Sequence, residues 1–264
     1  MSTQLHLASL LNKKGYPDRI IAGNALLYDT DIQECRNAIK VDRDAFFINA
    51  LLSYAGSITA IRKDNYSWAF IQSYYCIFYL AKVLLAGKDR FVYYVKGKPY
   101  RIKLSYGEHF TKEKKGNSHE VALRLFTEEF QDDSSLYSEI DGENSITWFN
   151  HKREEINYRL SPMPDPTPPA PLFKYNNDIR KWLAVYENEL LYAFDAEHCY
   201  MAFTTNLLKR VTDSYRQDKR QNNYVTDALL LHLKRNIADE KGPLPLVKRL
   251  EDLKKEHLYL CILP

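Results

Sequence analysis

A run of twenty mostly apolar residues constrains the fold of this chain more than any other feature. Residues 67–86 read SWAFIQSYYCIFYLAKVLLA, which is long enough to cross a bilayer as a helix. Gln72, Ser73 and Lys82 interrupt the run, and such polar or charged side chains are costly in hydrocarbon. The centre of a helical bundle also requires a helix that is apolar on all sides. We therefore expect a buried core helix and no membrane span.

Composition sets the class of protein. The 264 residues are 45% hydrophobic and 27% charged, which is typical of a globular protein with one sizeable core and a smaller appended unit. Nine glycines are few for this length and favour helices. The net charge of +3 is too small to demand a nucleic-acid partner. The four cysteines form no C-x-x-C pair and no leader opens the chain, so we expect a cytoplasmic protein.

Apolar periodicity predicts a mainly α fold: a helical bundle with an inserted β-hairpin and a C-terminal helical unit. Residues 161–171 hold six prolines in eleven positions, which excludes a helix and predicts a linker between residues 1–160 and a helical region at 172–264. The expected helices are 42–62, 66–85, 118–130, 144–160, 179–194, 200–215, 223–237 and 246–257, with less regular segments at 5–12 and 29–39.

The predicted hairpin, at 91–104, is basic and aromatic. Between residues 88 and 115 nine Lys or Arg face three Asp or Glu, and six aromatic residues are interleaved with them. Basic side chains track a nucleic-acid backbone while rings stack on unpaired bases, so we predict a nucleic-acid-binding surface. Its residues would be Lys96, Lys98, Tyr100, Arg101 and Lys103.

Two plainer interpretations of the hairpin stay open. Lysines on an edge hairpin prevent sheet aggregation and need have no other role. Residues 128–143 carry seven acids and no base, so the basic side chains of the hairpin could instead pair within the chain.

A second polar cluster closes the helix expected at 144–160. Two guanidinium groups beside an imidazole can grip and polarise a phosphate, and we treat this segment as a candidate catalytic site. The alternative is an ordinary solvated helix face whose basic side chains pair with Glu154 and Glu155. The candidate catalytic residues are His151, Arg153, Asn157, Tyr158 and Arg159.

Other chemistries have no counterpart in the sequence. The chain has no glycine-rich phosphate loop, no H-E-x-x-H and no G-x-S-x-G, and its seven histidines are isolated. We therefore predict neither a metal nor a cofactor.

The order of these segments resembles the HEPN superfamily of helical bundles, common in prokaryotic toxins, antiphage systems and RNA processing. A tyrosine-rich buried helix precedes an insertion and then a helix ending Arg153-Glu-Glu-Ile-Asn157-Tyr158. One branch of the superfamily carries arginine, two variable residues, alanine, aspartate and tyrosine; here isoleucine and asparagine replace alanine and aspartate. The resemblance covers about residues 42–160. Ribonuclease members carry an arginine followed four to six residues later by histidine, and this pair is missing here.

Three functions are consistent with these features. The first is an RNA- or partner-binding protein of a prokaryotic defence or toxin–antitoxin system, which the resemblance implies. The second is a metal-independent ribonuclease in which His151 accepts a proton and Arg153 stabilises charge on the phosphorane. The third is a structural subunit whose aromatic helices form a homo-oligomer.

Overall fold

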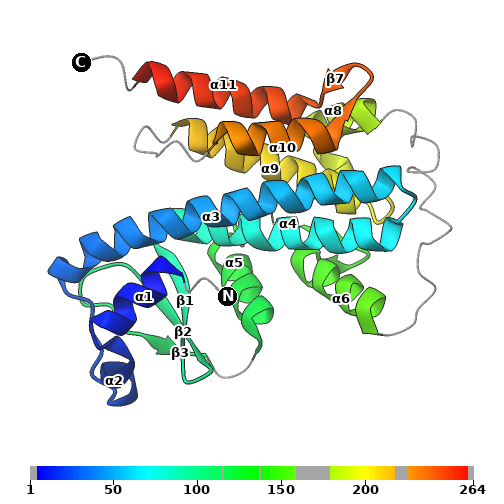
Figure 1. The fold of residues 1–264 in the computed structure, drawn as a ribbon. Coiled ribbons are helices and arrows are strands. Elements are labelled where there is room, and N and C mark those ends of the chain that lie inside the picture. The colour runs from blue at the N-terminus through cyan, green and yellow to red at the C-terminus, as the bar shows by residue number, and fades with distance from the viewer. Residues whose placement is uncertain (1–4, 114–115, 137, 159–178, 218–224, 261–264) are drawn as a thin grey trace. The chain divides into compact units, whose positions relative to one another are not determined.

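The computed structural model describes the chain except residues 1–4, 114–115, 137, 159–178, 218–224 and 261–264 (Figure 1). Its mainly α composition, with small antiparallel strand pairs, confirms the predicted fold class. Contacts divide the chain into two compact units. We call Met1–Ile48 with Phe78–Gln131 the sheet unit, and Asn49–Ile77 with Asp132–Pro264 the bundle unit. The predicted linker, 161–171, lies outside the described residues, and the chain on both sides of it belongs to the bundle unit.

Each unit combines helices with short strands. The sheet unit contains α1 (His6–Lys13), α2 (Tyr16–Ile21), β1 (Arg90–Val95), β2 (Lys98–Lys103), β3 (Thr111–Lys112) and α5 (Ser118–Glu129). Two long helices, α3 (Asp29–Arg62) and α4 (Tyr66–Gly87), contribute residues to both units. The bundle unit adds β4 (Glu139–Ile140), β5 (Glu143–Asn144), α6 (Ser145–Tyr158), α8 (Ile179–Asn188), the 3-10 helix η1 (Leu190–Phe194), α9 (Cys199–Gln217), α10 (Asp227–Ile237), β6 (Ala238–Asp239), β7 (Gly242–Pro243) and α11 (Pro245–Leu260).

Helix α3 is longer than the sequence predicted. We expected separate segments at 29–39 and 42–62, but one helix runs through both. The reason is that the Asp42 carboxylate, which could have capped a new helix, is 1% exposed and accepts hydrogen bonds from the backbone N–H groups of His6 (2.7 Å) and Leu7 (3.0 Å). Asp42 thus caps the first turn of α1, a contact between residues 35 or 36 positions apart.

The predicted helix 179–194 also differs. Helix α8 ends at Asn188, Glu189 has extended backbone angles (φ −115°, ψ 94°), and η1 follows as a 3-10 turn. The Asn188 side chain donates to the Ala184 carbonyl (2.8 Å), and so satisfies one of the acceptors that a helix leaves open at its C-terminus. The apolar spacing that suggested one helix therefore spans two elements.

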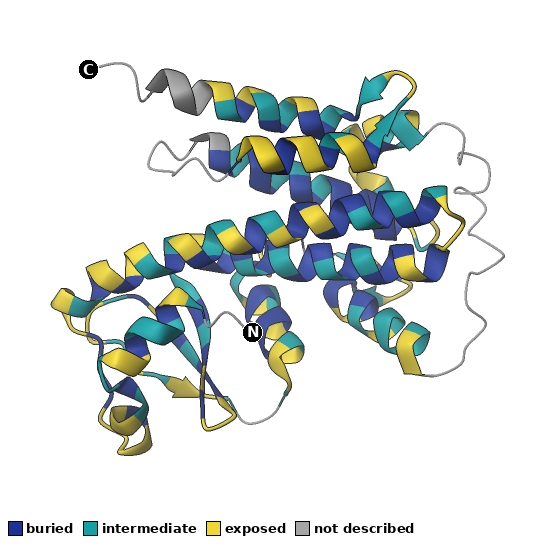
Figure 2. Ribbon diagram, in the orientation of Figure 1, coloured by how far each residue is buried: buried dark blue, intermediate teal, exposed yellow. Residues whose placement is uncertain are grey.

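The core of the bundle unit combines aromatic packing with a few satisfied polar groups. Phe70 of α4 lies 5.8 Å, centroid to centroid, from Phe149 of α6, which lies 5.4 Å from Phe203 of α9. Ser57 and Ser73 share a 2.8 Å hydrogen bond between α3 and α4. In Figure 2 the described residues of α4 and α9 are mostly buried, whereas α6 is buried at its start and exposed at its end. The expectation that residues 67–86 form a core helix agrees with this burial, because 72% of the most apolar stretch of α4 is buried.

Candidate functional site

The sheet of the sheet unit is antiparallel, in the order β1–β2–β3, and matches the predicted hairpin with one added edge strand. The two-residue turn between β1 and β2 has positive φ at both Lys96 (49°) and Gly97 (74°). This is the type I′ geometry that matches strand twist. Asn-Gly is the favoured sequence for such a turn, and a lysine in the left-handed region costs roughly 1 kcal/mol. Lys96 therefore occupies a position that its own backbone preference disfavours.

One face of the hairpin is neutralised by acids. Arg101 of β2 contacts Glu128 of α5 through two N–H groups, one at 3.0 Å, and forms ion pairs with Glu113 and Glu128. The hydrogen bond with Arg101 holds the pKa of Glu128 below its ordinary value, and that of Arg101 is raised by the same bond. Arg90 of β1 forms an ion pair with Glu129 of α5 (2.9 Å). The alternative of pairing within the chain thus applies to both arginines.

Further predicted contact residues of the hairpin are also engaged. The Tyr100 ring is 9% exposed and lies on the core face of the sheet, opposite Tyr93. Burial of this ring leaves little of it for stacking on a base. Lys103 lies 3.9 Å from Glu108, at the limit of an ion pair between exposed side chains, which is weak.

Three lysines of the sheet have no acidic partner among the residues that the structure describes. Lys96, Lys98 and Lys112 are exposed, and none of them has an ion pair or side-chain hydrogen bond among the residues that the structure describes. Register places Lys112 opposite Tyr100, and Lys98 lies two residues from Tyr100, so both lysines point to the same face. Tyr94 (38% exposed) pairs with Pro99 in the register, so it points to the opposite face, that of Arg101. The three lysines define the tip surface: Lys96, Lys98 and Lys112.

The second candidate site lies on α6. The Asn144 side chain caps this helix by accepting from the N–H of Ile146 (3.1 Å), and Trp148 and Phe149 anchor it in the core. Arg153 faces α4: its guanidinium lies 5.2 Å from the Tyr74 ring centroid and donates to Glu154 (3.2 Å). Its side chain is only 11% exposed.

His151 makes different contacts. Its Nδ1 lies 2.8 Å from a carboxylate oxygen of Glu143 on β5, and its side chain is 58% exposed. Asn157 is exposed and so is Tyr158, at 74%, while Arg159 lies outside the described residues. In the described part of the cluster His151 and Arg153 therefore contact separate partners on separate elements.

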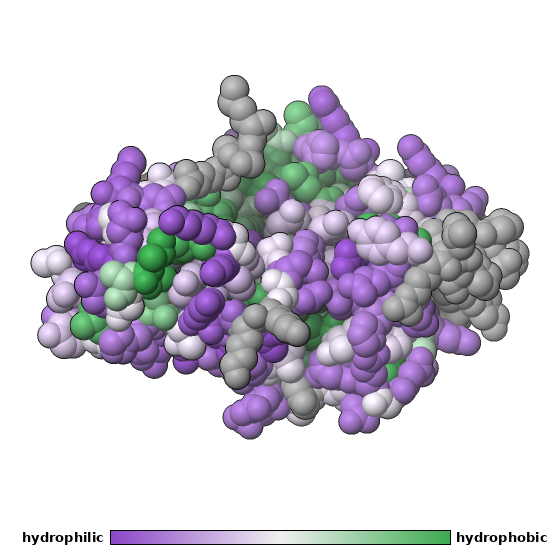
Figure 3. Space-filling model, turned by 90° about the horizontal axis from the view of Figure 1, so that it is seen from below, coloured by the Kyte–Doolittle hydropathy of each residue, from purple (hydrophilic) through white to green (hydrophobic). Residues whose placement is uncertain are grey.

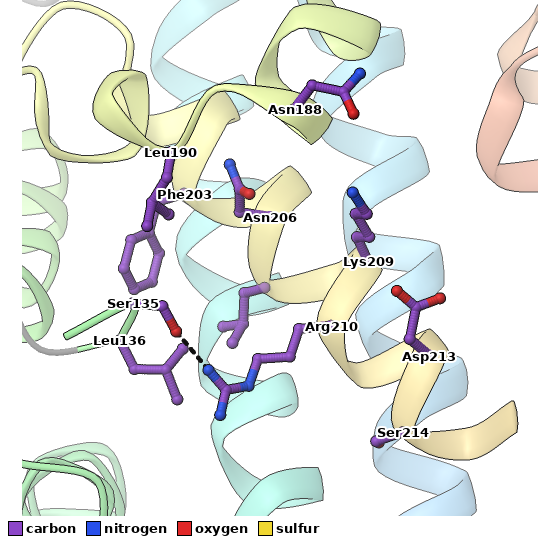
Figure 4. A pocket seen from close by; sticks show the side chains of 11 residues that line it. Ser135, Leu136, Asn188, Leu190, Phe203, Asn206, Lys209, Arg210, Asp213 and Ser214 are labelled. Atoms are coloured by element: carbon purple, nitrogen blue, oxygen red, sulfur yellow. Dashed lines mark hydrogen bonds between the residues drawn. The ribbon is translucent and has the colours of Figure 1, made fainter. Parts of the chain in front are cut away.

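A hollow of about 490 Å³ in the bundle unit was not predicted from the sequence (Figure 4). Leu136, Leu190 and Phe203 line one side, and Lys209, Arg210 and Asp213 line the other, with Asn206 between them. The only sequence signal was the basic stretch 209–220, which reads more simply as an exposed helix end. The other residues that line the hollow, such as Ser135 and Leu190, lie in distant segments of the sequence, so no local sequence pattern could reveal the hollow.

The described residues bear on two further kinds of site, for a metal ion and for a membrane. No group of three or more His, Cys, Asp or Glu side chains could hold a metal ion among the described residues. Helices α3 and α4 are long and apolar enough to span a membrane, yet 56% and 72% of their most apolar windows are buried in the structure, as in many core helices. One face of the molecule is mainly hydrophilic, with hydrophobic residues in small patches (Figure 3).

Comparison with known proteins found no family model, no curated protein and no solved structure that matches this chain.

Proposed function

We propose that this protein binds single-stranded RNA through the tip surface. The observation that carries the proposal is the pair of lysines at and beside a tight turn, Lys96 and Lys98, whose charges have no described partner. Phosphate contacts by such lysines supply most of the affinity for nucleic acid.

The distribution of charge supports this surface over the rest of the hairpin. Arg90 and Arg101 are already paired with acids of α5, so their charge adds little to an external field. Lysine at the φ-positive position 96 costs free energy that asparagine would avoid. A residue whose backbone conformation is unfavourable for its type points to a role for its side chain, and here the side chain offers a charge in solvent.

The test measures binding of a labelled single-stranded RNA by fluorescence anisotropy in EDTA. The variant Lys96→Asn/Lys98→Gln removes two charges, and asparagine suits the type I′ turn, so the hairpin should keep its fold. The control Lys63→Gln/Lys248→Gln removes the same charge from two exposed lysines of the bundle unit. We expect the tip variant to bind about tenfold or more weakly and the control to bind as the wild type does. An equal loss of RNA affinity in both variants would mean that only the net charge of the protein matters, and this result would contradict the proposal.

A metal-independent ribonuclease is the second candidate, and one observation favours it. The Glu143 carboxylate beside Nδ1 of exposed His151 would orient the ring as in a general base, with Nε2 toward solvent. Arg153 could stabilise a phosphate only if the phosphate replaced Glu154 as the partner of its guanidinium. Product size in the same RNA experiment tests this candidate: cleavage that disappears in His151→Ala supports it, and intact RNA in the wild type excludes it.

Membership of the HEPN superfamily, a companion protein, a homo-oligomer and a role in prokaryotic defence or a toxin–antitoxin system remain predictions that rest on the family resemblance and on composition. Arg153, Asn157 and Tyr158 would mark the family site in this proposal.

A further inference from the structure

Two exposed tyrosines of the sheet unit lie on segments that are hydrogen-bonded to each other. Tyr28 is 49% exposed at the residue before α3, and Tyr106 is 69% exposed in the loop after β2. The Gly107 N–H donates to the Leu27 carbonyl (3.2 Å), and the Leu27 N–H donates to the Glu108 carbonyl (3.3 Å). The neighbours of the two tyrosines are thus joined, although the tyrosines themselves are far apart in the sequence.

The backbone that carries each ring is fixed by further hydrogen bonds. The Tyr28 carbonyl accepts from the N–H of Asp31 (2.9 Å) at the start of α3. A hydrogen bond from the Glu108 N–H to the Ser105 carbonyl (3.3 Å) closes a turn around Tyr106. A tyrosine on a fixed backbone loses little conformational entropy when it binds a partner, which is why tyrosine is frequent in binding surfaces.

The two rings are not used by the fold itself. Neither ring has a ring contact, an ion pair or a side-chain hydrogen bond to another of the residues that the structure describes. A single exposed apolar side chain on a surface is ordinary and needs no explanation. Two exposed rings on joined and fixed segments are a different feature, because together they form a platform on which flat groups can stack.

An exposed segment of the chain connects Tyr106 with the tip surface. It passes through exposed His109 and then through β3, whose two residues, Thr111 and Lys112, are both exposed (Figure 2). Lys112 is one of the three lysines of the tip surface. The six residues from Tyr106 to Lys112 span at most about 20 Å. About six nucleotides cover this distance even at the duplex spacing of about 3.4 Å for each nucleotide of a strand.

The lysines favour a nucleic acid over a protein as the partner of these rings. Protein interfaces are depleted in lysine, whereas the exposed segment ends at Lys96, Lys98 and Lys112, which have no acidic partner among the described residues. Aromatic rings that stack on bases, beside basic side chains that contact phosphates, are the combination that binds single strands. In a duplex the bases are already paired and stacked, so an external ring cannot reach their faces.

We infer that Tyr28 and Tyr106 stack on unpaired bases of the RNA strand whose phosphates contact the tip surface. The two tyrosines, which we call the stacking pair, thereby select single-stranded over double-stranded RNA. The inference rests on the proposed function, because the lysines of the tip surface supply the phosphate contacts of the same strand.

The test compares two double variants in fluorescence anisotropy with a labelled single-stranded RNA. Tyr28→Leu/Tyr106→Leu removes both rings and keeps apolar bulk, whereas Tyr28→Phe/Tyr106→Phe keeps the rings. We expect the leucine variant to bind at least about tenfold more weakly and the phenylalanine variant to bind within about twofold of the wild type. The leucine variant should also lose most of the preference for single-stranded over double-stranded RNA. Trp68→Leu removes a ring of the same 49% exposure from the bundle unit and should bind as the wild type does.

An abasic RNA strand of the same length separates stacking from damage to the fold. The wild type and the leucine variant should bind this strand equally, since the leucine variant loses no phosphate contact. For the same reason the leucine variant should keep the salt dependence of the wild type on the natural strand. Weaker binding of the abasic strand by the leucine variant would overturn the assignment of the loss to stacking.

The outcomes distinguish this inference from the proposed function. A leucine variant that binds the natural strand as tightly as the wild type overturns the stacking pair and leaves the tip surface intact. If Lys96→Asn/Lys98→Gln binds as the wild type does while the leucine variant binds weakly, the role of the tip surface fails and the stacking pair stands. A wild type that binds no RNA contradicts both, and would assign the exposed rings to a protein partner.

Discussion

Arg101 and Glu128 form a two-point contact between β2 and α5, with one N–H···O distance of 3.0 Å. This contact determines which part of the basic hairpin can face a ligand. The Glu128 carboxylate neutralises the Arg101 guanidinium, so the uncompensated positive charge is that of the lysines of the tip surface. Arg101→Gln should therefore weaken RNA binding little. It should lower the free energy of unfolding by about 1–2 kcal/mol, since Glu113 and Glu128 lose their shared partner. Urea unfolding and anisotropy on the same variant check both halves of the prediction.

Arg153→Ala should destabilise the fold. The guanidinium is 11% exposed, lies over the Tyr74 ring and pairs with Glu154, so its removal loses packing and leaves a carboxylate of α6 without its partner. We expect a loss of about 1–3 kcal/mol in chemical unfolding. Arg153→Lys is the informative comparison, because it keeps the charge but not the planar stack. A variant as stable as the wild type would show that Arg153 is free for another role.

Asp42→Ala should loosen α1 from α3. The carboxylate caps the first turn of α1 from a buried position, and removal of such a cap costs about 0.5–2 kcal/mol. Amide hydrogen exchange should rise in His6–Lys13 more than in α9. Asp42→Asn, which keeps one acceptor oxygen, should recover part of the protection. Uniform exchange across both helices would contradict this role.

These contacts also show how far sequence reasoning reaches. The hairpin, α4 and α5 were predicted because their signals are local: β-branched and aromatic runs around a glycine turn, a continuous apolar run, and apolar residues at helical spacing in 118–130. The continuity of α3 was missed because the Asp42 carboxylate is used by residues 35 and 36 positions away. The hollow beside Asn206 was missed for the same reason, since Ser135 and Leu190 reach it only in the folded chain.

Asp133 should give the bundle unit an acid-sensitive contact. The hydrogen bond from Arg210 holds the pKa of this carboxyl at about 2, below its ordinary value of 3.8. Because the pKa in the folded state is the lower one, the stabilisation is complete above about pH 4 and is lost as the pH falls from 4 to 2. Arg210→Gln should move the Asp133 midpoint upward in a carbon-detected NMR titration. An unchanged midpoint in that variant would contradict the assignment.

Cys35, Cys76 and Cys199 should resist alkylation in the native protein. All three thiols are fully buried, and burial raises the pKa of Cys35 to about 11 and raises those of Cys76 and Cys199 as well. Thiolate, the reactive form, is therefore scarce at neutral pH. Mass spectrometry after a pulse of iodoacetamide should find these sites labelled only when urea unfolds the chain. Rapid labelling without urea would show that the helices around them open.

The salt dependence of RNA binding tests the central claim most directly. Each phosphate contact on single-stranded nucleic acid contributes about −0.7 to the slope of log K against log salt concentration. We predict that Lys96→Asn/Lys98→Gln makes this slope less negative by about 1.4, while Lys63→Gln/Lys248→Gln leaves it as in the wild type. An unchanged slope in the tip variant would contradict the proposal that Lys96 and Lys98 contact the RNA backbone.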